Sequence, residues 1–141
     1  ARAARAMRDH THPKLRAASN SHPVGKNGAA ASAKFSDSLE QQIHHLRDLM
    51  WKHVGIVRDG HGLQSALEAL EALRHQLPAP KFRREREAHN LLTTALLIAR
   101  SALARKESRG AHYRTDFPAH DDAHFKRHSV ISQAQHNVRF E

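Results

Sequence analysis

The stretch from Leu91 to Pro118, LLTTALLIARSALARKESRGAHYRTDFP, joins an apolar helical pattern to a basic segment that contains one glycine. Apolar residues recur here at spacings of three and four, which is the period of a helix with one buried face. They form a stripe of Leu92, Ala95, Leu96, Ala99, Ala102 and Leu103, which Leu91 and Ile98 widen. Cations then gather where the negative end of a helix dipole favours them, and Gly110 suits a left-handed cap. The pattern predicts a mostly buried helix that ends near Arg109, followed by an extended segment up to Pro118.

Two further amphipathic helices are predicted before this one. The first covers residues 36 to 58, where Asp37 and Glu40 have the spacing of a capping box. Its apolar face consists of Leu39, Ile43, Leu46, Met50, Val54 and Val57. Trp51 lies beside that face and is interpreted as a core or domain-interface anchor rather than as a ligand-stacking ring. The second helix runs from about Leu63 to Gln76, and a third begins around residues 82 to 85. Short connections between three such helices predict an all-α fold, an antiparallel three-helix bundle over residues 36–118.

The segments on either side of the predicted bundle have little apolar pattern. Residues 11–35 are rich in Ser, Ala, Asn, Gly and His and contain Pro13 and Pro23, which predicts a flexible linker in an N-terminal arm. Residues 119–141 are predicted to form an extended tail, in which 128–131 and 137–140 are either short edge strands or irregular chain.

Composition limits the classes of protein that fit. The 141 residues suit one domain, and with 39% hydrophobic but only 5% aromatic residues the core must consist mainly of Leu, Ala, Ile and Val. There is no cysteine, which excludes disulfides and thiolate chemistry and is compatible with a reducing, cytoplasmic compartment. No run is apolar and long enough to cross a bilayer, and no signal peptide is evident, so we expect a soluble protein without a membrane partner.

The formal charge of +9 raises nucleic acid as a partner, but its position argues against that reading. Residues 1 to 34 hold seven basic side chains and one acidic side chain, whereas the other 107 residues hold 16 basic and 13 acidic ones. The excess therefore lies in the arm rather than on a folded face. A stand-alone basic helical module that binds nucleic acid remains as an alternative, and it predicts an affinity that falls steeply with salt.

Two motifs resemble a known family. ARKESRGAHYRTDFPAHDD, Ala104 to Asp122, resembles the C-terminal region of the succinate dehydrogenase, fumarate reductase and L-aspartate oxidase flavoproteins. LRDLMWKHVGIVRDGHGLQSALEAL, Leu46 to Leu70, is similar to the L-aspartate oxidase branch of that family. Together with their surroundings the two matches cover roughly positions 36 to 128. Residues 1–10, ARAARAMRDH, resemble the last helix of the flavin domain that precedes this region in the family.

The resemblance implies a helical C-terminal domain of an FAD-dependent enzyme that oxidises L-aspartate to iminoaspartate, with oxygen or fumarate as acceptor, on the quinolinate route to NAD. The equivalent domain of a succinate dehydrogenase or fumarate reductase flavoprotein is the alternative within the family. The family's substrate-gripping residues belong to the flavin-binding and capping domains, which would be this chain's partners, so no catalytic residue is carried across. The chain has no Gly-rich dinucleotide loop and no nucleophile motif, and we expect it to bind no FAD itself.

What the resemblance does carry over is a turn that we expect to dock against the flavin domain, formed by Glu107, Ser108, Arg109, His112, Tyr113 and Arg114. The open alternative is a cap network inside the bundle, in which Arg109 or Arg114 bonds the last helix carbonyls and Glu107 or Asp116 supplies the counter-charge. Apolar faces normally covered by another domain would also favour self-association.

The chain contains 14 histidines, and His120, His124 and His128 are spaced four apart. On a helix that spacing would place all three on one face, as in a metal site. Pro118 and the polar surroundings argue against such a helix. We therefore predict solvated histidines and no metal.

Overall fold

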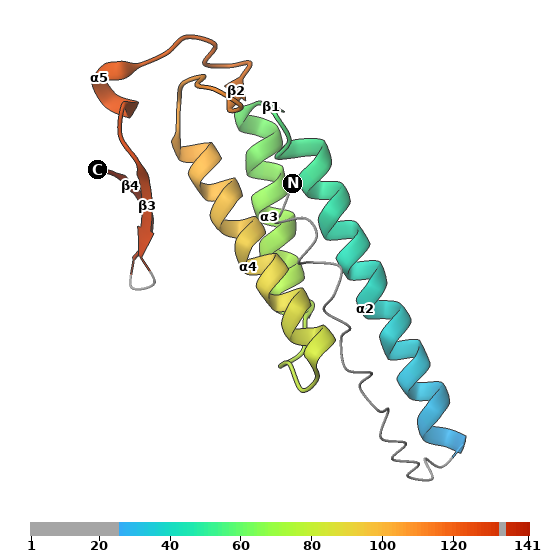
Figure 1. Ribbon diagram of the computed structural model, residues 1–141. Helices are drawn as coiled ribbons and strands as arrows, with labels where there is room; N and C mark the ends of the chain where they lie inside the picture. The colour runs from blue at the N-terminus through green and yellow to red at the C-terminus, as the bar shows by residue number, and fades with distance from the viewer. Residues whose placement is uncertain (1–25, 133–134) are drawn as a thin grey trace, which may run out of the picture.

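The computed structural model describes residues 26–132 and 135–141, with side chains from residue 37 onward except at 133–136. Three long helices lie side by side, and consecutive helices run in opposite directions (Figure 1). Their bounds are α2, Lys26–His53; α3, Gly60–Gln76; and α4, Arg83–Ala104. The described chain is thus mostly helical, as predicted.

The core consists mainly of leucine and alanine, in agreement with the composition. α3 packs most extensively on α4, with α2 covering both. The main buried cluster contains Leu46, Val54, Leu63, Ala66, Leu70, Leu73, Leu92, Ala95, Leu96, Ala99 and Ala102. A smaller one contains Leu39, Ile43 and Ala88. The predicted stripe on α4 is confirmed except at its edge, where Ile98 is 44% exposed.

α2 differs from the predicted first helix at both ends. It begins at Lys26, inside the segment predicted as a linker, because the run from Ala29 to Ala33 is rich in alanine, the residue with the highest helix propensity. The remainder of that linker and the predicted flavin-domain remnant at 1–10 lie outside the described residues. The helix ends at His53, before the predicted Arg58, and Trp51 is 87% exposed, so it is not a core residue of this chain.

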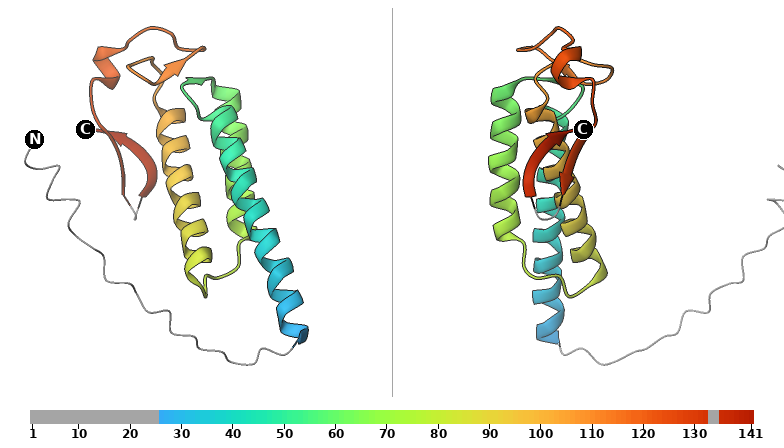
Figure 2. Two further views of the ribbon diagram at one scale, coloured as in Figure 1. Left: turned by 45° about the vertical axis from the view of Figure 1, so that its right-hand side comes forward. Right: turned by 90° about the vertical axis from the view of Figure 1, so that its left-hand side faces the viewer.

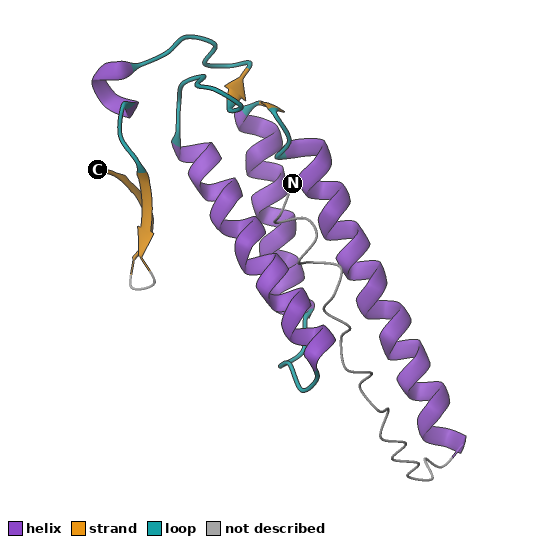
Figure 3. Ribbon diagram, in the orientation of Figure 1, coloured by secondary structure: helices purple, strands orange, loops and turns teal. Residues whose placement is uncertain are grey.

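The fold is not all-α, because two small sheets complete it (Figure 3). β1, Val57–Arg58, pairs in parallel with β2, Tyr113–Arg114. β3, Ser129–Ser132, pairs antiparallel with β4, Gln135–Phe140. The two-residue strands β1 and β2 show too little alternation to outweigh a helical sequence pattern. Of the two alternatives for residues 128–131 and 137–140, the structure has the short strands.

The predicted extended tail is a short helix followed by this hairpin. α5 covers Asp122–Phe125, and the β3–β4 hairpin then stands alongside α4 (Figure 2). The ring of Phe125 meets that of Phe140 edge-on, with centroids 4.9 Å apart. Among the described helices, none is both long and apolar enough to cross a membrane.

Candidate functional site

The six residues of the predicted docking turn lie between the end of α4 and α5. The structure brings all six into one region, but most of their polar groups face inward. Glu107, Ser108 and Arg114 are buried, Arg109 and His112 are partly buried, and the Tyr113 side chain is 44% exposed.

Arg114 bonds the last carbonyls of α4. Its side chain is only 2% exposed, and Nη1 donates to the carbonyl oxygens of Ala102 at 3.0 Å and Leu103 at 3.1 Å. These acceptors are among the four that a helix leaves without an internal partner. α4 therefore ends at Ala104, five residues before the predicted Arg109.

Asp116 supplies the counter-charge for Arg114. Its two carboxylate oxygens each accept a hydrogen bond at 2.7 Å, from Nε and Nη2 of Arg114. Asp116 Oδ2 also accepts from the backbone N–H of Gly60 at 3.0 Å, so the pair contacts the first residue of α3. The bidentate bond with Arg114 is the main reason that the pKa of Asp116 is lowered to about 2.

Gly110 has the predicted left-handed backbone, with φ of 58°, but it does not cap the helix. It lies in the tight turn between Arg109 and His112, whose backbones exchange two hydrogen bonds of 2.8 and 3.0 Å. The turn places the Arg109 side chain beside Glu107.

Glu107 is a fully buried carboxylate surrounded by donors. Arg109 donates to both of its oxygens at 2.9 Å, Arg105 donates at 2.6 Å, and the backbone N–H of Asp121 donates at 2.9 Å. The hydrogen bonds from Arg109 are the largest cause that lowers the pKa of Glu107 to about 2. The carboxylate thus stays ionised and holds the start of the tail against the turn.

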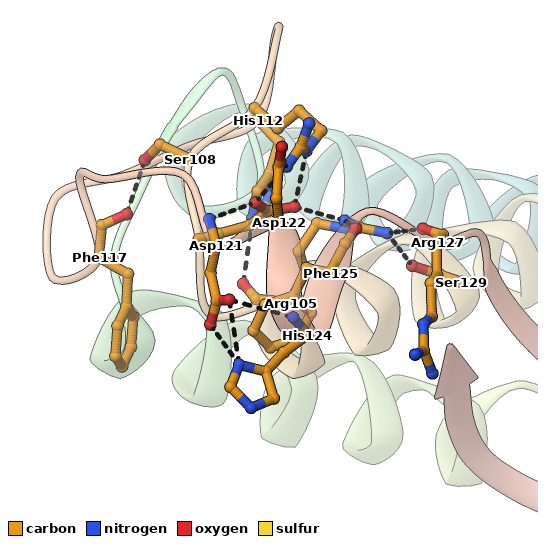
Figure 4. Close-up of polar contacts among 12 residues, drawn as sticks. Arg105, Ser108, His112, Phe117, Asp121, Asp122, His124, Phe125, Arg127 and Ser129 are labelled. Atoms are coloured by element: carbon orange, nitrogen blue, oxygen red, sulfur yellow. Dashed lines mark hydrogen bonds and ion pairs between the residues drawn. The ribbon is translucent and has the colours of Figure 1, made fainter. Parts of the chain in front are cut away.

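Ser108 organises the backbone of the same segment. Its hydroxyl accepts from the N–H of Arg114 at 2.9 Å. The same hydroxyl donates to the carbonyl of Phe117 at 2.8 Å (Figure 4). Its own N–H donates to the carbonyl of Ala119 at 3.1 Å. Ser108 therefore helps to hold the loop around Pro118 through both its side chain and its backbone.

His112 bonds a residue that the sequence did not single out. Arg58 Nη1 donates to His112 Nδ1 at 2.7 Å, and because a guanidinium has no acceptor, Nδ1 must be the unprotonated nitrogen. Nε2 then donates to the carbonyl of Arg105 at 3.2 Å. Burial, followed by the charges of Arg58 and Arg114, lowers the pKa of His112, so the imidazole is neutral. Arg58 lay at the end of the predicted first helix, and no local signal marked its partner 54 residues away.

Arg105 was also missed as a site residue, and it connects the turn to the tail. Besides Glu107, its guanidinium donates to the carbonyls of Phe125 and Arg127, both at 2.6 Å, and to the hydroxyl of Ser129 at 3.2 Å (Figure 4). It also lies over the Phe140 ring, 5.1 Å from the centroid. One side chain thus contacts α5 and both strands of the hairpin.

The three spaced histidines do not share a helix face, because α5 ends at Phe125. His124 instead shares hydrogen bonds with Asp121, whose oxygens lie 2.8 and 3.0 Å from Nδ1. Among the side chains that the structure describes, in residues 37–132 and 137–141, no group of three or more His, Asp or Glu is arranged to hold a metal ion.

The described residues do not fit FAD. A dinucleotide usually sits on a helix N-terminus behind a Gly-rich loop in a parallel sheet, whereas the parallel pair here is two residues per strand and is followed by no such loop. The polar side chains of the turn bind one another rather than facing an enclosed cavity. Fold and site together define a helical domain in which the buried charged residues of the turn pair with one another or with Asp116.

The comparisons with known proteins identify the family of this domain. A family model described as the fumarate reductase flavoprotein C-terminal domain matches residues 43–141. The chain therefore belongs to the C-terminal domain family of the succinate dehydrogenase and fumarate reductase flavoproteins, which includes L-aspartate oxidases.

Several curated relatives support this assignment. An L-aspartate oxidase of Rhodospirillum rubrum is 46% identical over 81 residues, which are 57% of this chain and 27% of the relative. An uncharacterized FAD-dependent oxidoreductase of Methanocaldococcus jannaschii is 42% identical over 93 residues, 62% of this chain and 17% of the relative. A fumarate reductase (CoM/CoB) polypeptide of Methanothermobacter marburgensis is 41% identical over 103 residues, 66% of this chain and 18% of the relative. The chain thus spans about a quarter or less of the length of these relatives.

Proposed function

We propose that this chain is the C-terminal domain of an FAD-dependent L-aspartate oxidase. The whole enzyme would remove a hydride from L-aspartate to give iminoaspartate, with oxygen or fumarate reoxidising the flavin, on the quinolinate route to NAD. The observation that carries the proposal is the 46% identity to an L-aspartate oxidase, together with further L-aspartate oxidases among the relatives. The Met50-Trp51 and Val54-to-Arg58 run, similar to that branch, agrees with it.

Within that enzyme the domain is proposed to act as a scaffold for the flavin-binding and capping domains, with no catalytic residue of its own. Glu107 and Arg114 support this role because their charges are already compensated by Arg109 and Asp116 inside the chain. Such groups fix a shape rather than bind a substrate. Tyr113, exposed on β2, remains the member of the predicted turn that is best placed to dock.

A fumarate reductase or succinate dehydrogenase flavoprotein is the second candidate. The Methanothermobacter fumarate reductase matches over more residues than the Rhodospirillum oxidase, 103 against 81. A fumarate reductase flavoprotein of Mycobacterium tuberculosis is 40% identical over 88 residues. Under both candidate functions, the residues that bind the flavin belong to a part of the polypeptide outside this chain.

The test uses the longest native polypeptide that contains this chain, purified with FAD. With L-aspartate under air, we expect peroxide formation and bleaching of the flavin absorbance when oxygen is removed. D-Aspartate is the stereochemical control, and succinate is the competing substrate. Oxidation of succinate without turnover of L-aspartate would replace the first proposal by the second.

A separate measurement checks that this chain does not hold the flavin. The 141-residue chain is mixed with FAD and passed through gel filtration. We expect the protein peak to emerge without flavin absorbance. A stoichiometric yellow complex would overturn the scaffold proposal.

A further inference from the structure

A groove lined mainly by apolar side chains runs between α2 and α4 towards β1. One hollow of about 500 Å³ and a second of about 370 Å³ adjoin, since Arg58 and Ile98 line both. We call their common surface the Arg58 groove, defined by Met50, Trp51, Leu91, Leu97, Ile98 and Arg58.

Three large apolar side chains in this groove are in contact with water. Trp51 is 87% exposed, Ile98 44% and Leu97 40%. Exposed large apolar side chains grouped beside a hollow are characteristic of protein interfaces, and Trp is prominent among residues that dominate binding energy. α3 fills the opposite side of α4, so the bundle itself leaves this face of α4 open.

Arg58 differs from the nearby Arg105, Arg109 and Arg114 because it has no carboxylate partner among the side chains that the structure describes. Arg105 and Arg109 bond Glu107, and Arg114 bonds Asp116. Within the described residues the Arg58 guanidinium bonds only the carbonyl of Gly55 and the neutral His112. Burial lowers the pKa of Arg58, and the guanidinium of Arg114 lowers it further. A guanidinium beside apolar side chains without a counter-charge favours a ligand that brings one.

We propose that the Arg58 groove receives an apolar segment that carries an Asp or Glu side chain, supplied by the flavin-binding part of the same longer polypeptide. The apolar side chains pack on Trp51 and Ile98, and the carboxylate bonds the free edge of the Arg58 guanidinium. This proposal rests on the proposed function, because it requires that this chain be one domain of a flavoprotein.

Two observations favour that occupant. This chain spans only 27% of the Rhodospirillum relative, so most of a family member's surface comes from sequence outside it. Residues 1–25 of this chain, which lie outside the described part, hold five basic side chains against one acidic one and would bring positive charge towards Arg58. A second copy of this chain has a formal charge of +9, so two copies repel each other electrostatically, which opposes a second copy as the occupant.

The test is site-specific photo-crosslinking in the full-length flavoprotein. p-Benzoylphenylalanine replaces Trp51, and in a matched control it replaces Gln64, an exposed residue of α3 that does not line the groove. After irradiation, peptide mass spectrometry should place the Trp51 crosslink in the flavin-binding part, within a few residues of an Asp or Glu. The Gln64 control should not label that peptide.

Charge variants test the role of Arg58 in the same experiment. Arg58→Gln should reduce the Trp51 crosslink about fivefold, because a charge-assisted hydrogen bond is lost, whereas Arg58→Lys should retain most of it. Circular dichroism checks that both variants stay folded, and if Arg58→Gln does not, the sequence of the crosslinked peptide decides alone. A crosslink to residues 1–25, to a second copy or to a peptide without a carboxylate would overturn the proposal, as would an unchanged yield in Arg58→Gln.

Failure of this proposal and failure of the proposed function give different results. An intact native mass equal to that of these 141 residues, without flavin, would remove the proposed function and the occupant together. A larger flavoprotein that turns over L-aspartate but shows one of the contrary crosslinks would overturn the groove proposal alone.

Discussion

Arg58 and His112, 54 residues apart, share a hydrogen bond of 2.7 Å that requires a neutral imidazole. The bond lies beside the parallel pair of β1 and β2, whose Arg58 and Arg114 are in register. A proton on Nδ1 of His112 would face the guanidinium of Arg58 directly. The turn and the groove are therefore joined by a histidine whose protonation on Nδ1 would break the contact with Arg58.

We expect His112 to make the chain less stable as pH falls below about 6.5, the ordinary pKa of histidine. The pKa of His112 is lowered in the folded protein. Between the ordinary pKa and this lowered pKa, the unfolded chain therefore binds a proton that the folded chain does not. Above the window both states are neutral and the effect vanishes. Urea unfolding of the parent and of His112→Gln at about pH 8, 7, 6 and 5 measures it as the difference between the two curves. Equal pH dependence in both proteins would contradict the prediction.

Replacement of Arg114 should destabilise the fold severely. Arg114→Leu removes two hydrogen bonds to α4 carbonyls and leaves the Asp116 carboxylate without its guanidinium, at an expected cost of about 3–5 kcal/mol. Arg83→Leu is the control, since the Arg83–Glu87 pair is exposed and its loss should change stability far less than the loss of Arg114 does. Urea unfolding followed by circular dichroism gives both values. A small loss in Arg114→Leu would mean that the helix end does not depend on this cap.

Glu107 should contribute stability that disappears in acid. Its pKa is lowered to about 2 in the folded chain, so its contribution is complete above the ordinary value near 4.5 and is lost as pH falls from there towards 2. Glu107→Gln should be less stable at about pH 7 and should show a shallower decline over that interval. Asp122→Asn, which removes an exposed partner of Arg109, is the comparison and should have a small effect. Acid titration monitored by circular dichroism tests this.

Arg105 should control the order of the tail without controlling the bundle. Arg105→Met keeps much of the apolar stem but removes the hydrogen bonds to the tail at Phe125, Arg127 and Ser129, together with one of the donors to Glu107. Hydrogen exchange should become faster in β3 and β4 and remain slow in α3. Equal acceleration in α3 would show that the substitution unfolds the whole chain and would contradict a local role.

The long helices were readable from sequence because each buries a stripe with a regular period. Leu63, Leu70 and Leu92 are buried as that period predicts. The end of α4 was not readable, because it is set by Arg114, ten residues beyond Ala104, rather than by the nearer Gly110. The two-residue strands gave no periodic signal at all.

The six residues of the candidate turn lie together in the structure, but the sequence alone did not decide between their possible interactions. Glu107 and Asp116 were named as possible counter-charges, and both serve as such, for Arg109 and Arg114. Docking of the turn against another domain stays a prediction. The role of Arg58 depends on a contact across 54 residues, which no local pattern encodes.

The β1–β2 pair also bears on how the chain folds. It joins positions 57 and 113, so its two backbone segments enclose both α3 and α4. Closing a loop of that length before the helices meet costs more chain entropy than forming the α3–α4 hairpin first. The contacts of the two-residue strands are too few to offset this cost. We therefore expect this register to form after the transition state. Substitutions around it should speed unfolding while leaving the refolding rate nearly unchanged.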